Sequence, residues 1–107
     1  MKVIIIEDEV LAQEKLEAML KCIDPSIEVI AKLGSVKESK HYLAQSPPAD
    51  LAFVDIQLSD DHSFEIFRSF PLQFPVIFTT AYDQYLLESF EHNAIDYLLK
   101  PVTEEKL

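Results

Sequence analysis

The chain has 107 residues, with 19 Asp and Glu against 9 Lys and Arg, for a formal charge of −10. This length suits one domain with a real core, and the acidic excess argues against direct nucleic-acid binding, because phosphates would repel this segment. A single Cys and a single Gly exclude an internal disulfide and a Gly-rich phosphate loop, and the lone Cys22 favours a reducing, cytoplasmic location.

The N-terminal segment contains an apolar run followed by an amphipathic stretch. Residues 3–6 are continuous β-branched residues, as in a strand buried on both faces. Acidic residues follow this run too early for a signal peptide, and no apolar run in the chain is long enough for a membrane span. Residues 10–20 are predicted to form a helix, in which Glu17 and Lys21 make a favourable pair four positions apart. The apolar positions of that helix are Leu11, Ala12, Leu16, Met19 and Leu20.

The same alternation continues to the end of the chain. After a break at Asp24-Pro25-Ser26, residues 27–31 are predicted to form a second strand. Ser35 and Glu38 fit a capping box, so a helix should begin there and run to about residue 45. The later predictions are a strand over 51–54 ending at Asp55, a short helix over 63–69, a strand over 76–79, a helix over 83–92, a strand over 95–99 and a helix beginning near Thr103.

Five strand–helix units in alternation predict an α/β fold with a parallel sheet and helices on both faces. Five strands suit the doubly wound, flavodoxin-like order 2-1-3-4-5, and the chain is far too short for an eight-fold barrel. The last helix would be cut about one turn after it begins, at Leu107. We therefore expect a truncated fifth helix and a fragment of a longer chain.

Polar residues follow four of the predicted strands. In such sheets, ligands bind beyond the carboxyl ends of the strands, here between the first and third strands, where strand order reverses. The residues at these ends are Glu7, Asp8 and Glu9 after the first strand, Asp55 after the third, Thr79 and Thr80 after the fourth, and Lys100 after the fifth.

Clustered carboxylates repel one another unless a cation lies among them, and hard oxygen ligands open to water suit Mg²⁺. An Asp beside such a metal can act as a nucleophile, while a lysine and a threonine can bind phosphoryl oxygens. Each residue alone has a simpler interpretation. Glu9 is better read as a charge in the first turn of a helix, and a single lysine is most often solvated. The three His residues share no ligand spacing.

The residues at these strand ends resemble those of the receiver domain of bacterial two-component response regulators, and the resemblance covers the whole chain. It rests on Glu7-Asp8, on Asp55 in Phe53-Val54-Asp55-Ile56, on Thr80-Ala81 and on Lys100-Pro101. Residues 78–83 and 93–101 are similar to the LytTR-type subgroup in particular. The family has the CheY-like form of the predicted fold. The resemblance implies one receiver domain over residues 1–107 and a DNA-binding output domain C-terminal to it.

The resemblance also implies the chemistry of the site. Asp55 would accept a phosphoryl group from a sensor histidine kinase. Mg²⁺ would be bound directly by Asp8, largely through water by Glu7, and also by Asp55 and the backbone carbonyl of Gln57. The chain would take up and lose phosphate without being a turnover enzyme.

Further residues would read out the phosphorylation. Thr80 and Lys100 would bind the phosphoryl oxygens, and Tyr97 would turn inward as Thr80 moves. A cis peptide would join Lys100 to Pro101, which an X–Pro bond permits. The signal would leave through the fourth helix, fifth strand and fifth helix, usually by homodimerisation.

Two departures from the family pattern concern the loop after Asp55. Ser59 stands where Pro is usual and Ser63 where Gly is usual, and the loop carries the additional acids Asp60 and Asp61. These changes affect the expected shape of the loop and not the chemistry of the site, since no side chain of the site is lost.

The sequence leaves two alternative functions. The first is a pseudo-receiver that binds partners without being phosphorylated. The presence of all five key side chains of a receiver site argues against it; these are Glu7, Asp8, Asp55, Thr80 and Lys100. The second is a Mg²⁺-dependent phosphatase with an Asp nucleophile. Haloacid-dehalogenase-type phosphatases have a second acid two residues after the nucleophile, where this chain has Gln57.

Overall fold

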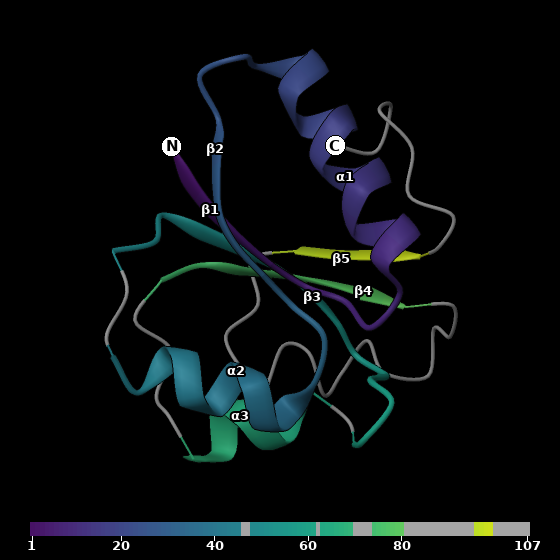
Figure 1. The fold of residues 1–107 in the computed structure, drawn as a ribbon, viewed down its shortest axis with the longest axis vertical. Helices are drawn as coiled ribbons and strands as arrows, with labels where there is room; N and C mark the ends of the chain where they lie inside the picture. Colours follow the sequence, from purple (N-terminus) through teal and green to yellow (C-terminus); the bar gives the residue numbers. More distant parts are fainter. Residues whose placement is uncertain (46–47, 62, 70–73, 81–95, 100–107) are drawn as a thin grey trace.

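The computed structural model describes residues 1–45, 48–61, 63–69, 74–80 and 96–99. Its centre is a five-stranded parallel sheet in the order β2-β1-β3-β4-β5, which confirms the predicted doubly wound topology (Figure 1). The strands are β1 (Lys2–Ile6), β2 (Glu28–Leu33), β3 (Leu51–Asp55), β4 (Val76–Thr80) and β5 (Asp96–Leu99).

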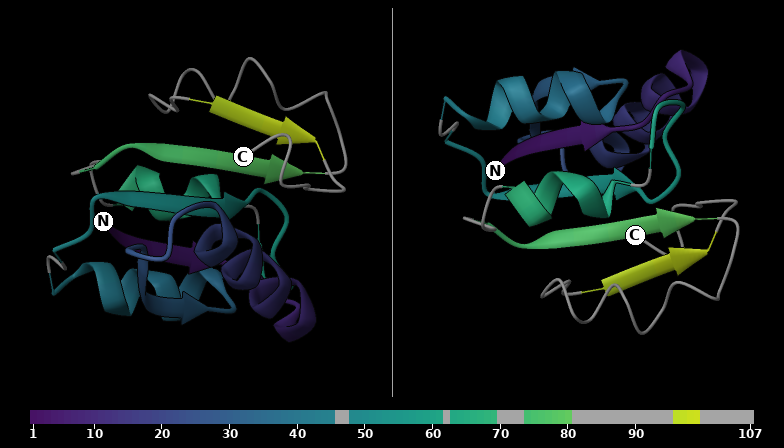
Figure 2. Two further views of the ribbon diagram at one scale, coloured as in Figure 1. Left: turned by 90° about the horizontal axis from the view of Figure 1, so that it is seen from above. Right: turned by 90° about the horizontal axis from the view of Figure 1, so that it is seen from below.

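Helices cover both faces of this sheet, as predicted. Helix α1 (Val10–Ile23) lies on one face, and α2 (Val36–Leu43) and α3 (Phe64–Ser69) lie together on the other (Figures 1 and 2). The helices predicted over 83–92 and from Thr103 fall outside the described residues. In the parts of the chain that the structure describes, the helices are too short or too polar to span a bilayer.

The strand β1 supplies the core on both faces, because its side chains alternate between them. Ile4 and Ile6 belong to the cluster under α2 and α3, whereas Val3 and Ile5 pack with Leu16 on the α1 side. These four residues of β1 are each at most 1% exposed. This explains why the strand reads as a continuous apolar run instead of an alternating one.

Helix α1 begins at the predicted residue and continues beyond residue 20, to Ile23. Its buried positions are Gln13, Leu16 and Leu20. Leu11, which we counted among the apolar positions of this helix, is 80% exposed. Leu11 therefore does not lie on the inward face of the helix, as its spacing predicted. The polar Gln13 takes the inward position in the first turns.

Ser35 begins α2 as the capping box predicted. Its Oγ accepts a hydrogen bond from the Glu38 N–H over 3.0 Å, which satisfies one of the free N–H groups at the helix start. The helix ends at Leu43, before the predicted boundary near residue 45.

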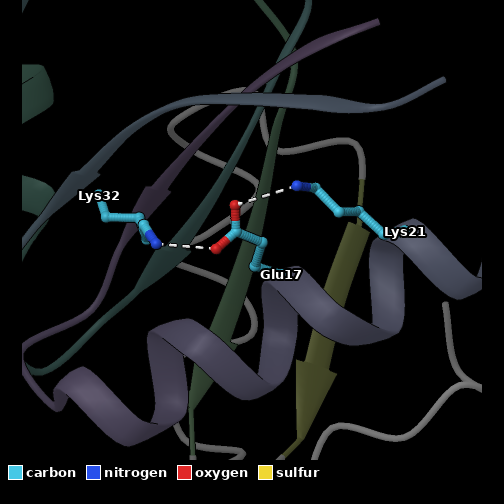
Figure 3. A network of polar contacts seen from close by, with 3 residues as sticks. All are labelled: Glu17, Lys21 and Lys32. Atoms are coloured by element: carbon cyan, nitrogen blue, oxygen red, sulfur yellow. Dashed lines mark hydrogen bonds and ion pairs between the residues drawn. The ribbon is translucent and has the colours of Figure 1, made fainter. Parts of the chain in front are cut away.

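The predicted pair between Glu17 and Lys21 is present, at 3.7 Å between charged atoms. Lys32 of β2 also binds Glu17, at 2.7 Å between Nζ and Oε1, and Figure 3 shows the carboxylate between both ammonium groups. These contacts lower the pKa of Glu17 from its ordinary value of 4.5, and the hydrogen bond from Lys32 is the largest cause. The network joins α1 to the edge strand β2.

Replacing Glu17 with Gln should lower the free energy of unfolding by up to about 1 kcal/mol at neutral pH, because the pairs lie near the surface. A lowered folded-state pKa contributes stability that is fully present above pH 4.5 and is lost as the pH falls through the folded value. Urea unfolding of both proteins across this range should show the difference shrinking towards low pH. Glu14→Gln, an exposed position on the same helix, is the control; an equal loss there would contradict a specific network.

Candidate functional site

The register of the sheet brings the carboxyl ends of its strands to one edge. Ile6 pairs with Val54, Asp55 pairs with Thr79, and Thr80 pairs with Leu99. The residues that directly follow β1 therefore lie next to the last residue of β3. This is the point at which the strand order reverses.

Three carboxylates meet at this edge. Glu7, Asp8 and Asp55 each offer one oxygen, and these oxygens all lie within 4.8 Å of one another. Glu7 and Asp55 are buried, at 6% and 5% exposed, while Asp8 is exposed to solvent. The structure thus brings together the three acids that the sequence placed at the switch point.

Backbone and side-chain hydrogen bonds hold Glu7 in place. Its N–H donates to the Leu33 carbonyl over 2.9 Å, which extends the pairing with β2 beyond the strand. The buried Gln13 donates from Nε2 to the Glu7 carbonyl over 2.6 Å. The Glu9 N–H donates to Glu7 Oε1 over 3.3 Å. Gln13 was missed by sequence reasoning; a polar residue at an inward helical position was the available signal.

Asp55 is the last residue of β3, and its surroundings are set by the neighbouring strand and the following loop. The Gln57 N–H donates to Asp55 Oδ1 over 3.3 Å. The Ile56 N–H donates to the Thr79 carbonyl over 2.9 Å, so the pairing with β4 continues past the strand end. Ile56 itself is fully buried, which anchors the chain next to the carboxylate.

The predicted hydroxyl is at the same edge. Thr80 ends β4 and is 1% exposed, and Thr79 beside it is 5% exposed. Tyr97 lies in β5 and pairs with Phe78 of β4. Lys100 and Pro101, the predicted lysine and cis-proline, fall outside the described residues.

The loop after Asp55 is tied to the start of α2. The N–H groups of Val36 and Lys37 donate to the two carboxylate oxygens of Asp60, over 2.9 Å and 3.1 Å. These hydrogen bonds lower the pKa of Asp60 from its ordinary value of 3.8, and the bond from the Val36 N–H is the largest cause. The contact joins residues 24 and 23 positions apart, so no local sequence pattern could have revealed it.

Ser63, at the position where the resemblance leads us to expect Gly, is fully buried. Its Oγ is the one buried side-chain N or O atom in the described residues that has no hydrogen-bond partner. A buried hydroxyl left without a partner costs about 1–3 kcal/mol. The buried Ser63 hydroxyl is therefore a structural cost in this loop.

The donor set fits Mg²⁺. Carboxylate oxygens are its preferred protein ligands, and two oxygens bound to one ion at about 2.1 Å are separated by at most about 4.2 Å. The three oxygens of the cluster all lie within 4.8 Å of one another, an upper limit close to that separation. The exposed Asp8 and the buried Glu7 and Asp55 leave one side of the cluster accessible for a ligand.

A doubly wound parallel sheet with acids at its switch point defines a class of ligand-binding α/β domains. Within that class, the sequence model of the response regulator receiver domain matches residues 3–107. The chain therefore belongs to the response regulator receiver domain family.

Similar curated proteins agree with this family membership. The sensory transduction protein LytT of Bacillus cereus is 41% identical, with 100% of this chain and 44% of that protein covered. The transcriptional regulatory protein BtsR of Salmonella typhi is 37% identical, with 99% and 44% covered. These agree with the LytTR-type resemblance. The chain spans less than half the length of these curated relatives.

A solved structure supports the same conclusion. The response regulatory domain of protein mrkE from Klebsiella pneumoniae has a TM-score of 0.85 and 30% identity, over 99% of this chain and 88% of that one. The protein is therefore a receiver domain of the two-component response regulators, with LytT among its relatives.

Proposed function

We propose that this domain is a Mg²⁺-dependent phosphoacceptor and that Asp55 is the residue phosphorylated. The observation that carries this proposal is the grouping of Glu7, Asp8 and Asp55, with carboxylate oxygens within 4.8 Å at the switch point. Family membership supports it independently. Asp8, Asp55 and the backbone carbonyl of Gln57 would bind Mg²⁺ directly, and Glu7 largely through water.

Asp55 would act as the nucleophile in a phosphoryl transfer. One of its carboxylate oxygens forms a bond to phosphorus as the bond between phosphorus and a histidine nitrogen of the kinase breaks, and that nitrogen retains the electron pair and takes up a proton. Bound Mg²⁺ would offset negative charge on the phosphoryl oxygens. The burial of Asp55 supports this role, because a low-dielectric surrounding strengthens contacts with the incoming group.

Thr80 and Lys100 would bind the remaining phosphoryl oxygens. The buried hydroxyl of Thr80 at the end of β4 could follow the added charge and move its loop, and Tyr97 would respond as the switch residue. A cis peptide before Pro101 would place Lys100. The face made by the fourth helix, β5 and the fifth helix would then carry the signal, by forming a homodimer.

The partners follow from the same proposal. A sensor histidine kinase would supply the phosphoryl group in the cytoplasm, and a C-terminal DNA-binding domain would carry the response to promoters. The relatives named LytT and BtsR, of which this chain covers 44%, support that organisation. The receiver domain itself would not bind DNA and would not turn over substrate, since Gln57 occupies the place of a second acid.

Incubation with Mg²⁺ and a small acyl phosphate should add one phosphoryl group, seen as a change in intact mass and located by peptide mapping at Asp55. Removal of Mg²⁺ with a chelator and the substitution Asp55→Asn should each abolish uptake, since one removes the ion and the other the nucleophile. Asp50→Asn, which alters an exposed acid before the same strand, is the matched control. No uptake by the folded chain would refute the proposal, and continuous phosphate release would indicate a phosphatase.

A further inference from the structure

The loop between β3 and α3 is closed on itself. The Leu58 N–H donates to the Asp61 carbonyl over 3.1 Å, and the Ser63 N–H donates to the Ile56 carbonyl over 2.7 Å. These two bonds bring the beginning and the end of the loop together. Ile56 and Leu58 are buried, at 0% and 8% exposed, while Gln57 between them is exposed.

Asp60 fastens this loop to a separate element. Its carboxylate accepts from the first two N–H groups of α2, those of Val36 and Lys37. Hydrogen bonds to a charged acceptor are about twice as strong as neutral ones, and the positive end of a helix favours a carboxylate there. The clamp therefore holds the outer end of the loop against a helix that packs on the sheet.

A loop without proline depends more on such a clamp than a loop with proline does, because proline would restrict its backbone. Ser59 precedes Asp60, and a serine leaves the backbone free at a position where proline would restrict it. Without a fixed ring in the loop, contacts with the rest of the fold must supply the order. In the described residues, two hydrogen bonds to the Asp60 carboxylate join this loop to the start of α2.

We propose that Asp60 is a positioning residue for the metal site, which it orders by anchoring the loop that carries Gln57 to the N-terminus of α2. This inference rests on the proposed function, because Gln57 is the residue whose carbonyl would bind Mg²⁺. Asp60 lies outside the cluster of three carboxylates and would not bind the ion itself. It holds the outer end of the loop against α2, so less ordering of the Gln57 backbone remains to be done when the ion binds.

A simple helix cap would stabilise α2 without affecting the site, and Ser35 provides the matched comparison. Its Oγ accepts from Glu38 N–H at the same helix start, but it lies on the α2 side and does not anchor the loop. Asp60→Ala and Ser35→Ala both remove caps of α2. Only the first releases the loop.

In the metal-free chain, Asp60→Ala should reduce the hydrogen-exchange protection of the Leu58 and Ser63 amides by about tenfold, because both close the loop. Its affinity for Mg²⁺, measured by calorimetry at fixed ionic strength, should fall by about tenfold. Ser35→Ala should leave both values close to those of the native chain. Asp61→Asn removes the same negative charge from the same loop and should lower the affinity by much less.

Four results decide the matter. Equal protection and equal affinity in Asp60→Ala and the native chain would overturn the inference and leave the proposed function standing. Equal losses in Asp60→Ala and Ser35→Ala would reduce Asp60 to a helix cap, and equal losses in Asp60→Ala and Asp61→Asn would reduce it to a charge. A native chain that binds no Mg²⁺ would overturn the proposed function and this inference with it. If Asp60→Ala does not fold, Asp60→Asn, which retains one acceptor oxygen, replaces it.

Discussion

Replacing Asp8 with Asn should lower the affinity of the chain for Mg²⁺ by about tenfold to a hundredfold. Loss of a residue that surrounds the ligands of a metal already has effects of about this size, and loss of Asp8, which we propose as a direct ligand, should cost at least as much. Asp8 is the exposed member of the carboxylate cluster, so its substitution leaves the packed core unchanged. Calorimetric titration with Mg²⁺ at constant ionic strength measures the effect.

Glu9→Gln is the control for this experiment. Glu9 is the next residue in the chain, is exposed, and precedes α1 without capping it through its side chain. Its substitution removes the same charge from nearly the same place, but it is outside the cluster of three. Only a small loss is expected from Glu9→Gln, and losses of equal size in both variants would mean that Mg²⁺ responds to the general negative charge of this edge.

Replacing Phe78 with Ala should lower the free energy of unfolding by about 3–5 kcal/mol. Phe78 is fully buried and makes edge-to-face contacts with Phe64 and Phe67, at centroid distances of 5.0 Å and 5.9 Å. It joins β4 to α3, and its removal leaves a cavity between them. Because domains of this size are stable by only about 5–15 kcal/mol, this variant should unfold at a much lower urea concentration.

Phe74→Ala is the matched control for Phe78→Ala. Phe74 packs against the same cluster but is only partly buried, so its loss opens a cavity that water can enter and should cost less than half as much. Both free energies come from urea unfolding followed by circular dichroism. A loss below about 1.5 kcal/mol for Phe78→Ala would show that the aromatic cluster repacks around the gap.

The order of the elements could be predicted from sequence because each strand and helix carries its own local signal. The β-branched run of β1, the helical spacing of α1 and the capping serine of α2 all gave boundaries close to those observed. Errors arose where a local pattern is ambiguous. Leu11 fits the apolar spacing of α1, yet the helix is rotated so that Gln13 faces inward, and only packing against the sheet decides that rotation.

The acids of the site were also accessible from sequence. Glu7, Asp8 and Asp55 follow directly after buried strands, and the parallel topology alone requires that the ends of those strands share an edge. What they do there remains a proposal that the phosphorylation and Mg²⁺ experiments test. The membership of the chain in the receiver family came from its motifs, and the comparison with known proteins agrees.

The net charge of −10 and the single glycine determine little alone. The alternating pattern predicts the fold class and suits the strand order 2-1-3-4-5, and the residues after the strands predict the place of the acids. Those features depend on hydrophobic periodicity and on the order of the elements along the chain, which the sequence carries. The tertiary structure decided which charges act together. Asp60 binds the start of α2, and Lys32 binds Glu17. Both contacts join distant segments, and the packing of the helices on the sheet decides which residues meet. No local sequence pattern records that packing.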